Sequence, residues 1–219
     1  MPKISSVESQ KNPHRFNIFL DGVFVFGADE DLVVDQRLVI GKEIAPGDLE
    51  KLLFESAVGK LMERMYTLFN IRQRSEKEIR DYLKNLSFKR KVKDQDELSE
   101  AAVELLIIKL KQKGLLNDGE FAKSWAAARR RSKQKGKRLL QYELAQKGIA
   151  KNIIDQVLEK GSEDYSEEGL ATVALQKKLK LWQKLPELEF KKKTYQFLGR
   201  KGFDFETISA VIEKFLEKE

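Results

Sequence analysis

The chain has 219 residues, with 42 Lys and Arg against 35 Asp and Glu, which gives a net charge of +7. Hydrophobic residues make up 41% of it, enough for a buried core, so wholesale disorder is excluded. Charged residues make up 35%, whereas there are only 13 glycines and 4 prolines. This balance favours long helices with charged outer faces over a turn-rich sandwich or barrel.

Several classes of catalytic and metal site are excluded by composition. The chain has no cysteine and a single histidine, His14. Disulfides, thiolate metal sites, cysteine nucleophiles and Ser-His-Asp triads therefore cannot form. His14 follows Pro13 in a polar segment, and we interpret it as a surface residue. No phosphate-binding glycine motif occurs, so we expect a protein that is not an enzyme and holds no metal or cofactor.

The hydropathy pattern predicts no membrane segment. No apolar run approaches the ~20 residues that a membrane-spanning helix requires. The N-terminal residues 1–8 lack the apolar stretch of a signal peptide. We therefore expect a soluble, cytoplasmic protein.

The charge is unevenly distributed along the chain. Residues 1–71 hold 8 basic and 11 acidic side chains, so the positive charge lies after residue 71. Within residues 123–147 there are nine basic side chains and one acidic one, Glu143. This asymmetry indicates an anionic partner, most simply nucleic acid. A lysine-rich solvated surface is the alternative interpretation.

Residues 15–44 have the pattern of short strands. Phe16, Ile18 and Leu20 alternate with their neighbours, and Asp21-Gly22 is a strong signal for a two-residue hairpin turn. Residues 23–26 then form the return strand, and residues 32–34 and 37–40 resemble two further strands. The preceding 14 residues are interpreted as a polar leader. A hairpin alone is barely stable, so the sheet should pack on a helix.

That helix is predicted to begin near Pro46 and to end at about Phe69. Proline is favoured at a first helical position, where its missing N–H costs nothing. Apolar residues recur every three or four positions and predict one buried stripe: Leu49, Leu52, Leu53, Ala57, Leu61, Met65 and Leu68.

Beyond Arg72 the sequence is helical and internally repeated. Ser75 and Glu78 form a capping box. A small residue lies twelve positions after each of Ser75, Gly136 and Phe190. Each of these three small residues has a leucine four positions before it. The small residues are Ser87, Gly148 and Gly202, and the leucines are Leu83, Leu144 and Leu198. Leu110-x-x-Lys113-Gly114-Leu115 is a related string. These endings predict left-handed glycines at 114, 148 and 202, with the next apolar residue packed on the leucine.

The repetition predicts a mainly α protein, in which tandem three-helix repeats form an elongated, curved array after a small N-terminal β unit. Further helices are expected over residues 117–134 and from a start between Ser162 and Ser166, which Pro186 ends. The predicted organisation is a β unit at 1–45, a connecting helix at 46–71, repeats at 72–135 and 136–188, and a truncated third repeat at 189–219.

The helix over 117–134 carries the candidate binding residues. At about 100° per residue, Phe121, Trp125, Ala128 and Ser132 share one face, which should be buried. Arg130 should then point directly away from the core. The predicted contacts to phosphate are Arg129, Arg130, Arg131, Lys133, Lys135, Lys137 and Arg138, with Lys191, Lys192, Lys193 and Arg200 as a second group. In the alternative, the arginines form salt bridges to neighbouring helices and merely keep the protein soluble.

Three strings resemble signatures of one family. Arg72-x-Arg74-Ser75-x-x-Glu78-Ile79-x-x-x-Leu83 resembles the opening helix of the RecX regulatory proteins of bacteria. Leu115-Leu116-Asn117-Asp118-x-x-Phe121-Ala122, with the arginines after it, and Glu143-Leu144-x-x-Lys147-Gly148-Ile149 are similar to that family's central signature.

The resemblance implies a non-enzymatic modulator of the RecA recombinase. Such a protein would bind the groove of the RecA–DNA filament and limit recombinase and coprotease activity in recombination, DNA repair and the SOS response. It implies binding to single- and double-stranded DNA, and we expect a monomer. From the residues alone, two alternatives remain open: a helix-turn-helix transcription regulator, which would protect one operator, and a protein-only helical scaffold, whose binding would change little with salt.

Overall fold

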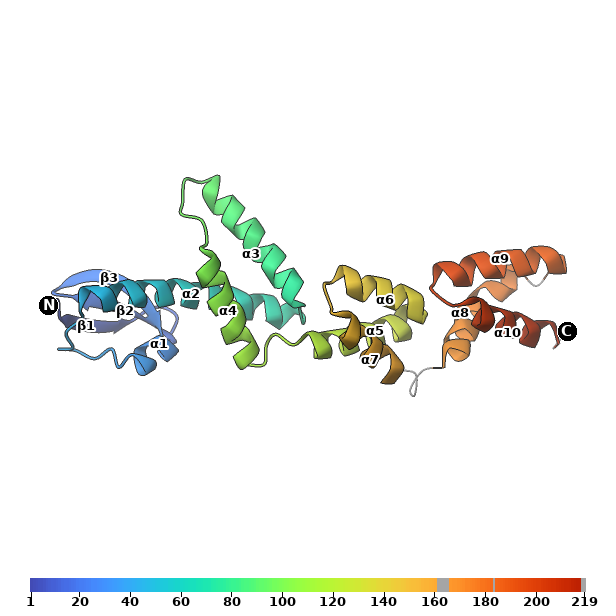
Figure 1. Cartoon of the computed structure of the whole chain (residues 1–219), viewed down its shortest axis with the longest axis horizontal. Coiled ribbons are helices and arrows are strands. Elements are labelled where there is room, and N and C mark those ends of the chain that lie inside the picture. Colours follow the sequence, from blue (N-terminus) through green and yellow to red (C-terminus); the bar gives the residue numbers. More distant parts are fainter. Residues whose placement is uncertain (161–165, 183, 218–219) are drawn as a thin grey trace. The chain divides into compact units, whose positions relative to one another are not determined.

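The computed structural model describes residues 1–160, 166–182 and 184–217 (Figure 1). Helices account for well over half of the described residues, and every strand lies within the first 29. The chain divides into two compact units. The first unit comprises Met1–Gln73 and Arg80–Leu116, and the second comprises Arg74–Ile79 and Asn117–Glu219. The prediction of a helical protein with a small N-terminal sheet is confirmed.

The first unit begins with a three-stranded antiparallel sheet. Its strands are β1 (Ile4–Ser9), β2 (Arg15–Leu20) and β3 (Val23–Asp29), in the order β1-β2-β3. Asp21 and Gly22 join β2 to β3 with φ values of 48° and 83°, as the hairpin prediction requires. The polar leader prediction was wrong, since residues 4–9 pair with β2 through an edge strand whose outer positions are polar.

The two further strands that we predicted do not form. Residues 32–34 lie in a short helix, α1 (Glu30–Asp35), and residues 37–40 form turns, with Arg37 at φ 47°. The Asp29 carboxylate accepts a hydrogen bond from the Leu32 N–H at 2.8 Å and caps the helix. That cap outweighs the β propensity of the valines.

Helix α2 (Pro46–Ile71) packs on β3 and on α4 (Glu100–Gln112). Leu52, Leu61 and Met65 of the predicted stripe are buried, but Leu53 and Ala57 are exposed. Their place in the core is taken by other residues: Ser56, Val58, Gly59 and Met62. The Ser56 hydroxyl donates to the Gly27 carbonyl, so the small residues allow the helix to approach the strand backbone closely.

Helix α3 (Glu76–Lys91) begins as predicted, because the Ser75 hydroxyl accepts from the Glu78 N–H at 3.3 Å. It continues past Ser87, which stands in the repeated pattern where Gly148 and Gly202 end their helices. Ser87 lies inside the helix, and its hydroxyl accepts from the Leu98 N–H at 3.0 Å. Phe88 is 65% exposed instead of packing on Leu83. A serine lacks the freedom of glycine at positive φ and therefore does not end the helix there.

The second unit contains two three-helix bundles. Helices α5 (Asp118–Lys133), α6 (Lys137–Gln146) and α7 (Lys151–Lys160) enclose one core, and α8 (Glu167–Trp182), α9 (Glu187–Arg200) and α10 (Phe205–Leu216) enclose another. The predicted repeat boundaries after residues 135 and 188 fall inside these bundles. Of the predicted start of α8, positions 162–165 lie outside the described residues, while the Ser166 hydroxyl accepts from the Gly169 N–H at 3.0 Å.

The three predicted glycine endings are confirmed. Gly114, Gly148 and Gly202 have φ values of 68°, 79° and 90°. In each case the N–H of the next residue donates to the leucine carbonyl five positions earlier, as from Ile149 to Leu144 at 3.1 Å and from Phe203 to Leu198 at 3.2 Å. The glycine N–H donates to the carbonyl three positions back. These bonds define Schellman motifs.

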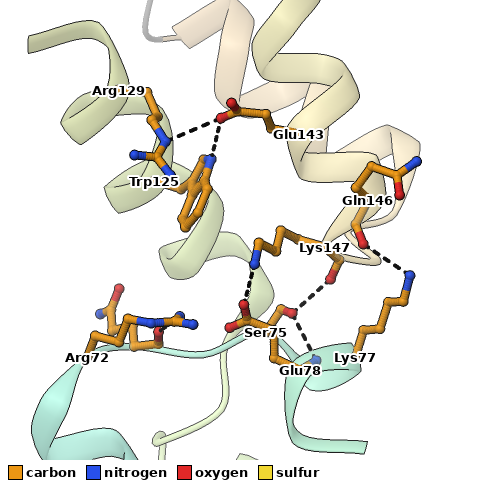
Figure 2. Close-up of polar contacts among 10 residues, drawn as sticks. Arg72, Ser75, Lys77, Glu78, Trp125, Arg129, Glu143, Gln146 and Lys147 are labelled. Atoms are coloured by element: carbon orange, nitrogen blue, oxygen red, sulfur yellow. Dashed lines mark hydrogen bonds and ion pairs between the residues drawn. The ribbon is translucent and has the colours of Figure 1, made fainter. Parts of the chain in front are cut away.

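Two of these endings are joined to the start of another helix, and we call these places the first and second junctions. At the first junction, the Ser75 hydroxyl donates to the carbonyl of Lys147, the last residue before Gly148, at 2.8 Å (Figure 2). At the second junction, the Gly136 N–H donates to the carbonyl of Lys201, the last residue before Gly202, at 2.9 Å. Ser75 and Gly136 both directly precede a helix.

A second contact also recurs at both junctions. The Glu76 N–H, the first in α3, donates to the Asp118 carboxylate at 2.9 Å. The Lys137 N–H, the first in α6, donates to the Glu167 carboxylate at 3.0 Å. Asp118 and Glu167 are in turn the first residues of α5 and α8. The internal repeat therefore preserves how the helices are joined as well as the helices themselves.

Candidate nucleic-acid interface

Helix α5 buries a different face from the one we predicted. Its buried residues are Phe121, Ala122, Ala126 and Arg130, whereas Ala128 and Ser132 are exposed. Arg130 is only 3% exposed, so the prediction that it points away from the core was wrong. Its guanidinium lies near Leu158 of α7, whose carbonyl accepts at 3.5 Å, and its charge acts on the carboxylate of Glu167. Arg130 is therefore placed as a structural residue.

Arg129 and Lys135 are held by the one acidic residue of the basic segment. Arg129 lies over the ring of Trp125, 4.2 Å from its centroid, and its Nε is 3.3 Å from the Glu143 carboxylate (Figure 2). The same carboxylate accepts from the Trp125 indole N–H at 3.0 Å and from Lys135. These two residues fit the alternative reading, in which basic side chains form salt bridges to a neighbouring helix.

Glu143 is ionised in spite of its surroundings. Burial favours its neutral form, but the hydrogen bonds from Lys135 and Trp125 and the charges of Lys135 and Arg129 outweigh this and hold the pKa of Glu143 below its ordinary value. The site thus joins α5 to α6 through a charged and aromatic contact, and two of the predicted phosphate contacts, Arg129 and Lys135, share its one carboxylate.

The other predicted residues of this segment face solvent. Arg131, Lys133, Lys137 and Arg138 are exposed, at the end of α5 and the start of α6. They surround a turn in which Gln134 adopts φ 46°. No carboxylate within the described ranges lies at ion-pair distance from these four side chains. They form the part of the predicted surface that is available to a phosphate backbone.

The second predicted group lies on α9. Lys191 pairs with Glu187 one turn earlier, and Lys193 lies 3.9 Å from Glu189. Lys192 is exposed, and the Arg200 Nε donates to the Gln196 carbonyl at 3.1 Å. The glutamates in the first turn of this helix therefore offset part of its positive charge.

The sequence did not predict that Lys177, Lys178 and Lys201 lie together with Lys135 around the second junction. We call Lys135, Lys177, Lys178 and Lys201 the lysine cluster, because the charges of the first three all act on Lys201. Lys177 and Lys178 lie on α8, and Lys201 directly follows α9. The string Leu198-x-x-Lys201-Gly202 did single out Lys201, but only as a residue that ends a helix. Its neighbours are distant in sequence, so only the fold brings them together.

The described residues contain neither a membrane-spanning helix nor a group of potential metal ligands. No helix among them is both long and apolar enough to cross a bilayer. No three acidic or histidine side chains in the described ranges are grouped so as to hold a metal ion.

Comparisons with known proteins agree with the resemblance seen in the sequence. Family models match in three places: the Regulatory protein RecX N-terminal domain at residues 2–45, the second three-helix domain of RecX at 117–158, and its third three-helix domain at 166–212. The last two ranges cover α5–α7 and α8–α10, so both bundles correspond to domains of that family.

Individual relatives match over most of the chain. Regulatory protein RecX of Bacillus velezensis is 34% identical over 216 residues, which are 98% of this chain and 78% of the relative. Regulatory protein RecX of Listeria innocua is 32% identical over 93% of this chain and 72% of its own. A crystal structure of regulatory protein RecX, 27% identical, aligns with a TM-score of 0.75 over 97% of this chain and 100% of its own.

A crystal structure of RecX from Lactobacillus salivarius has the same fold, with a TM-score of 0.62 at 22% identity, over 72% of this chain and 95% of its own. The three domain matches follow one another in the family's order along a chain whose relatives are about one-third identical. The chain therefore belongs to the RecX family of regulatory proteins.

Proposed function

We propose that this protein regulates the RecA recombinase by binding the RecA–DNA filament, and that it mostly inhibits recombinase and coprotease activity. Membership of the RecX family carries this proposal. In this role the protein acts by binding and catalyses no reaction, in the cytoplasm, as a monomer, on filaments of single- or double-stranded DNA.

The distribution of charge supports a nucleic-acid partner. The second unit holds 24 Lys and Arg against 18 Asp and Glu, whereas the first unit is nearly balanced, with 18 against 17. Six of the seven net positive charges therefore belong to the second unit. Phosphate contacts need accessible cations, and Arg131, Lys133, Lys137 and Arg138 are exposed there. Lys191, Lys192, Lys193 and Arg200 are proposed to extend this surface.

The direct test is the ATPase activity of RecA on single-stranded DNA, measured with substoichiometric amounts of this protein. We expect ATP hydrolysis to fall, because a regulator that binds along a filament affects many RecA subunits at once. An unchanged rate at every ratio, together with unchanged strand exchange, would contradict the proposal. Protection of one DNA sequence in a footprint would instead favour a transcription regulator.

The basic surface is tested by a double variant, Arg131→Ala with Lys133→Ala. Neither side chain is buried, so the variant should unfold at the wild-type temperature. Removing two phosphate contacts should lower the slope of log affinity against log salt by about 1.4–1.8, at ~0.7–0.9 per contact. The matched control is Lys123→Ala on the same helix, because Lys123 already pairs with Glu120 at 2.7 Å. Equal slopes for both variants would remove this surface from the proposal.

A further inference from the structure

The two junctions have the same backbone contacts but different charge balance. At the first junction Lys147, directly before Gly148, pairs with Glu78, the third residue of α3 (Figure 2). At the second junction the equivalent lysine is Lys201, directly before Gly202. The third residue of α6, in the place of Glu78, is Leu139. The carboxylate that neutralises the lysine at the first junction is thus replaced by the apolar side chain of Leu139 at the second.

The same replacement occurs a second time. Arg129 is the twelfth residue of α5 and lies beside Glu143, four positions before Lys147. Lys178 is the twelfth residue of α8 and lies beside Phe197, four positions before Lys201. Both bundles keep the cation, while the glutamate of α6 is replaced by a phenylalanine in α9. The two carboxylates that pair with Lys147 and Arg129 therefore have no counterpart beside Lys201 and Lys178, and the carboxylate of Asp204 is instead acted on by Arg138 and Lys137.

Three of the four ammonium groups of the lysine cluster, those of Lys177, Lys178 and Lys201, lie on neutral partners at this junction. Lys201 Nζ donates to the Lys133 carbonyl at 2.6 Å, and Lys177 Nζ donates to the Gln134 side-chain oxygen at 2.7 Å. Lys178 and Lys201 lie 5.8 and 5.4 Å from the centroid of Phe197. Only Lys135 has a carboxylate partner, Glu143, among the residues that the structure describes.

This arrangement places positive charges together where they repel one another. Burial, and then the charges of Lys177, Lys135 and Lys178, hold the pKa of Lys201 below its ordinary value. The backbone beneath the cluster is closely packed: Gly136 lies against the backbone of Gly202, where an added Cβ would come within 2.6 Å of the Gly202 carbonyl oxygen. Three lysines that have no carboxylate partner among the described residues, gathered at this packed turn, match a bound anion.

We propose that the second junction is a phosphate-binding site, in which Lys177, Lys178 and Lys201 contact adjacent phosphate groups of a nucleic-acid backbone. Lys135 contributes charge while it remains paired with Glu143. The assignment of nucleic acid as the source of the phosphates rests on the proposed function, whereas the phosphate site itself follows from the comparison of the two junctions. The first junction, where Lys147 pairs with Glu78, serves as its internal reference.

The test is a double variant of the full chain, Lys178→Gln with Lys201→Gln, titrated with a labelled single-stranded oligonucleotide at several salt concentrations. Loss of two contacts should lower the log–log salt slope by about 1.4 and the affinity about 25-fold in ~0.1 M salt, at ~0.7 per contact. Thermal unfolding should be unchanged or occur at a higher temperature, because the variant relieves repulsion. Lys123→Gln, which loses a paired lysine, should leave the slope unchanged.

A second variant restores the missing carboxylate without removing a lysine. Leu139→Glu copies the first junction and should pair with Lys201 as Glu78 pairs with Lys147. We expect it to weaken oligonucleotide binding and to raise the pKa of Lys201. NMR of the lysine side chains measures this pKa. If both variants bind the oligonucleotide with wild-type affinity and salt slope, the site is wrong.

The source of the phosphate is decided by a parallel titration with inorganic triphosphate. The proposal expects the oligonucleotide to raise the Lys201 pKa in the wild-type protein. A response to triphosphate alone would overturn the nucleic-acid assignment. RecA ATPase activity is measured with the same variants. If the variants still inhibit RecA and bind DNA as the wild type does, this site is rejected but the proposed function is kept. If the wild type does not affect RecA, the proposed function fails, while the titrations still decide the site.

Discussion

Left-handed glycines fix where the middle helices of the two bundles end. Gly148 and Gly202 differ from Gly114 in their surroundings, although all three have positive φ. A Cβ at Gly148 would lie 2.6 Å from the Cβ of Lys77, whereas nothing lies within 4 Å of one at Gly114. Gly148 therefore needs glycine both for its backbone conformation and for its close approach to Lys77, whereas Gly114 needs it for its backbone conformation alone.

This difference predicts unequal costs for the same substitution. Gly114→Ala should lower the free energy of unfolding by about 1–2 kcal/mol, the cost of a left-handed residue with a Cβ. Gly148→Ala should cost clearly more, because α3 must also move away from the turn. Urea unfolding followed by circular dichroism measures both. Equal losses would show that the contact between Lys77 and the turn adapts without cost.

Arg130 shows what a helical wheel alone cannot decide. The sequence predicted an inner face from Phe121 and Trp125, but two helices pack on α5, and together they cover Ala122, Ala126 and Arg130 as well. Three consecutive arginines gave no signal for which one is buried. The fold distinguishes them: Arg129 pairs with Glu143, Arg130 is buried and Arg131 is exposed.

We therefore expect Arg130→Ala to destabilise the protein instead of selectively weakening nucleic-acid binding. Removing the cation near the Glu167 carboxylate, together with the buried side-chain volume, should cost about 3 kcal/mol. Arg130→Met keeps much of the volume and separates packing from charge. Thermal unfolding is the measurement. A variant that melts like the wild type but binds DNA poorly would return Arg130 to the binding surface.

At the scale of helices, two glutamates act on stability in opposite directions. The pKa of Glu143 lies below its ordinary value of 4.5 because its bonds to Lys135 and Trp125 outweigh burial. Its contribution to stability is therefore present above pH 4.5 and is lost as the pH falls through the lowered pKa. Burial raises the pKa of Glu167 above 4.5, so its contribution is present at low pH and is lost as the pH rises through the raised pKa.

The two neutral variants should accordingly differ at pH 7. Glu143→Gln should lower the melting temperature and make it fall less steeply in acid, since a carboxylate whose ionised form stabilises the folded state is gone. Glu167→Gln should leave the melting temperature unchanged or raise it, because Gln still accepts from the Lys137 N–H without carrying a buried charge. Melting curves from pH 3 to 8 would measure both effects, and shifts of the same sign would contradict this assignment.

At the scale of the whole molecule, local signals were predictable and pairings between distant segments were not. The Asp21-Gly22 turn, the glycine endings and the Ser75 cap are each set by a few neighbouring residues, and all were predicted correctly. The edge strand β1 was missed because only pairing with β2 makes polar residues 4–9 a strand. The grouping of Lys177, Lys178 and Lys201 around Lys135 was missed for the same reason, since these residues come from α8 and from the turns that follow α5 and α9.

The junctions have a consequence for how such a chain can lengthen. At each one, the exposed carbonyls at the end of one middle helix are satisfied at the start of another, Lys147 by Ser75 and Lys201 by Gly136. The start of α9 is different, because Pro186 stands where Ser75 and Gly136 stand, and proline has no N–H and no side-chain donor to offer a carbonyl. A duplicated copy of residues 166–217 placed there would lose the carbonyl contact that both junctions share. Growth by gene duplication at this end would therefore first require a residue with a donor, such as serine or glycine, in the place of Pro186.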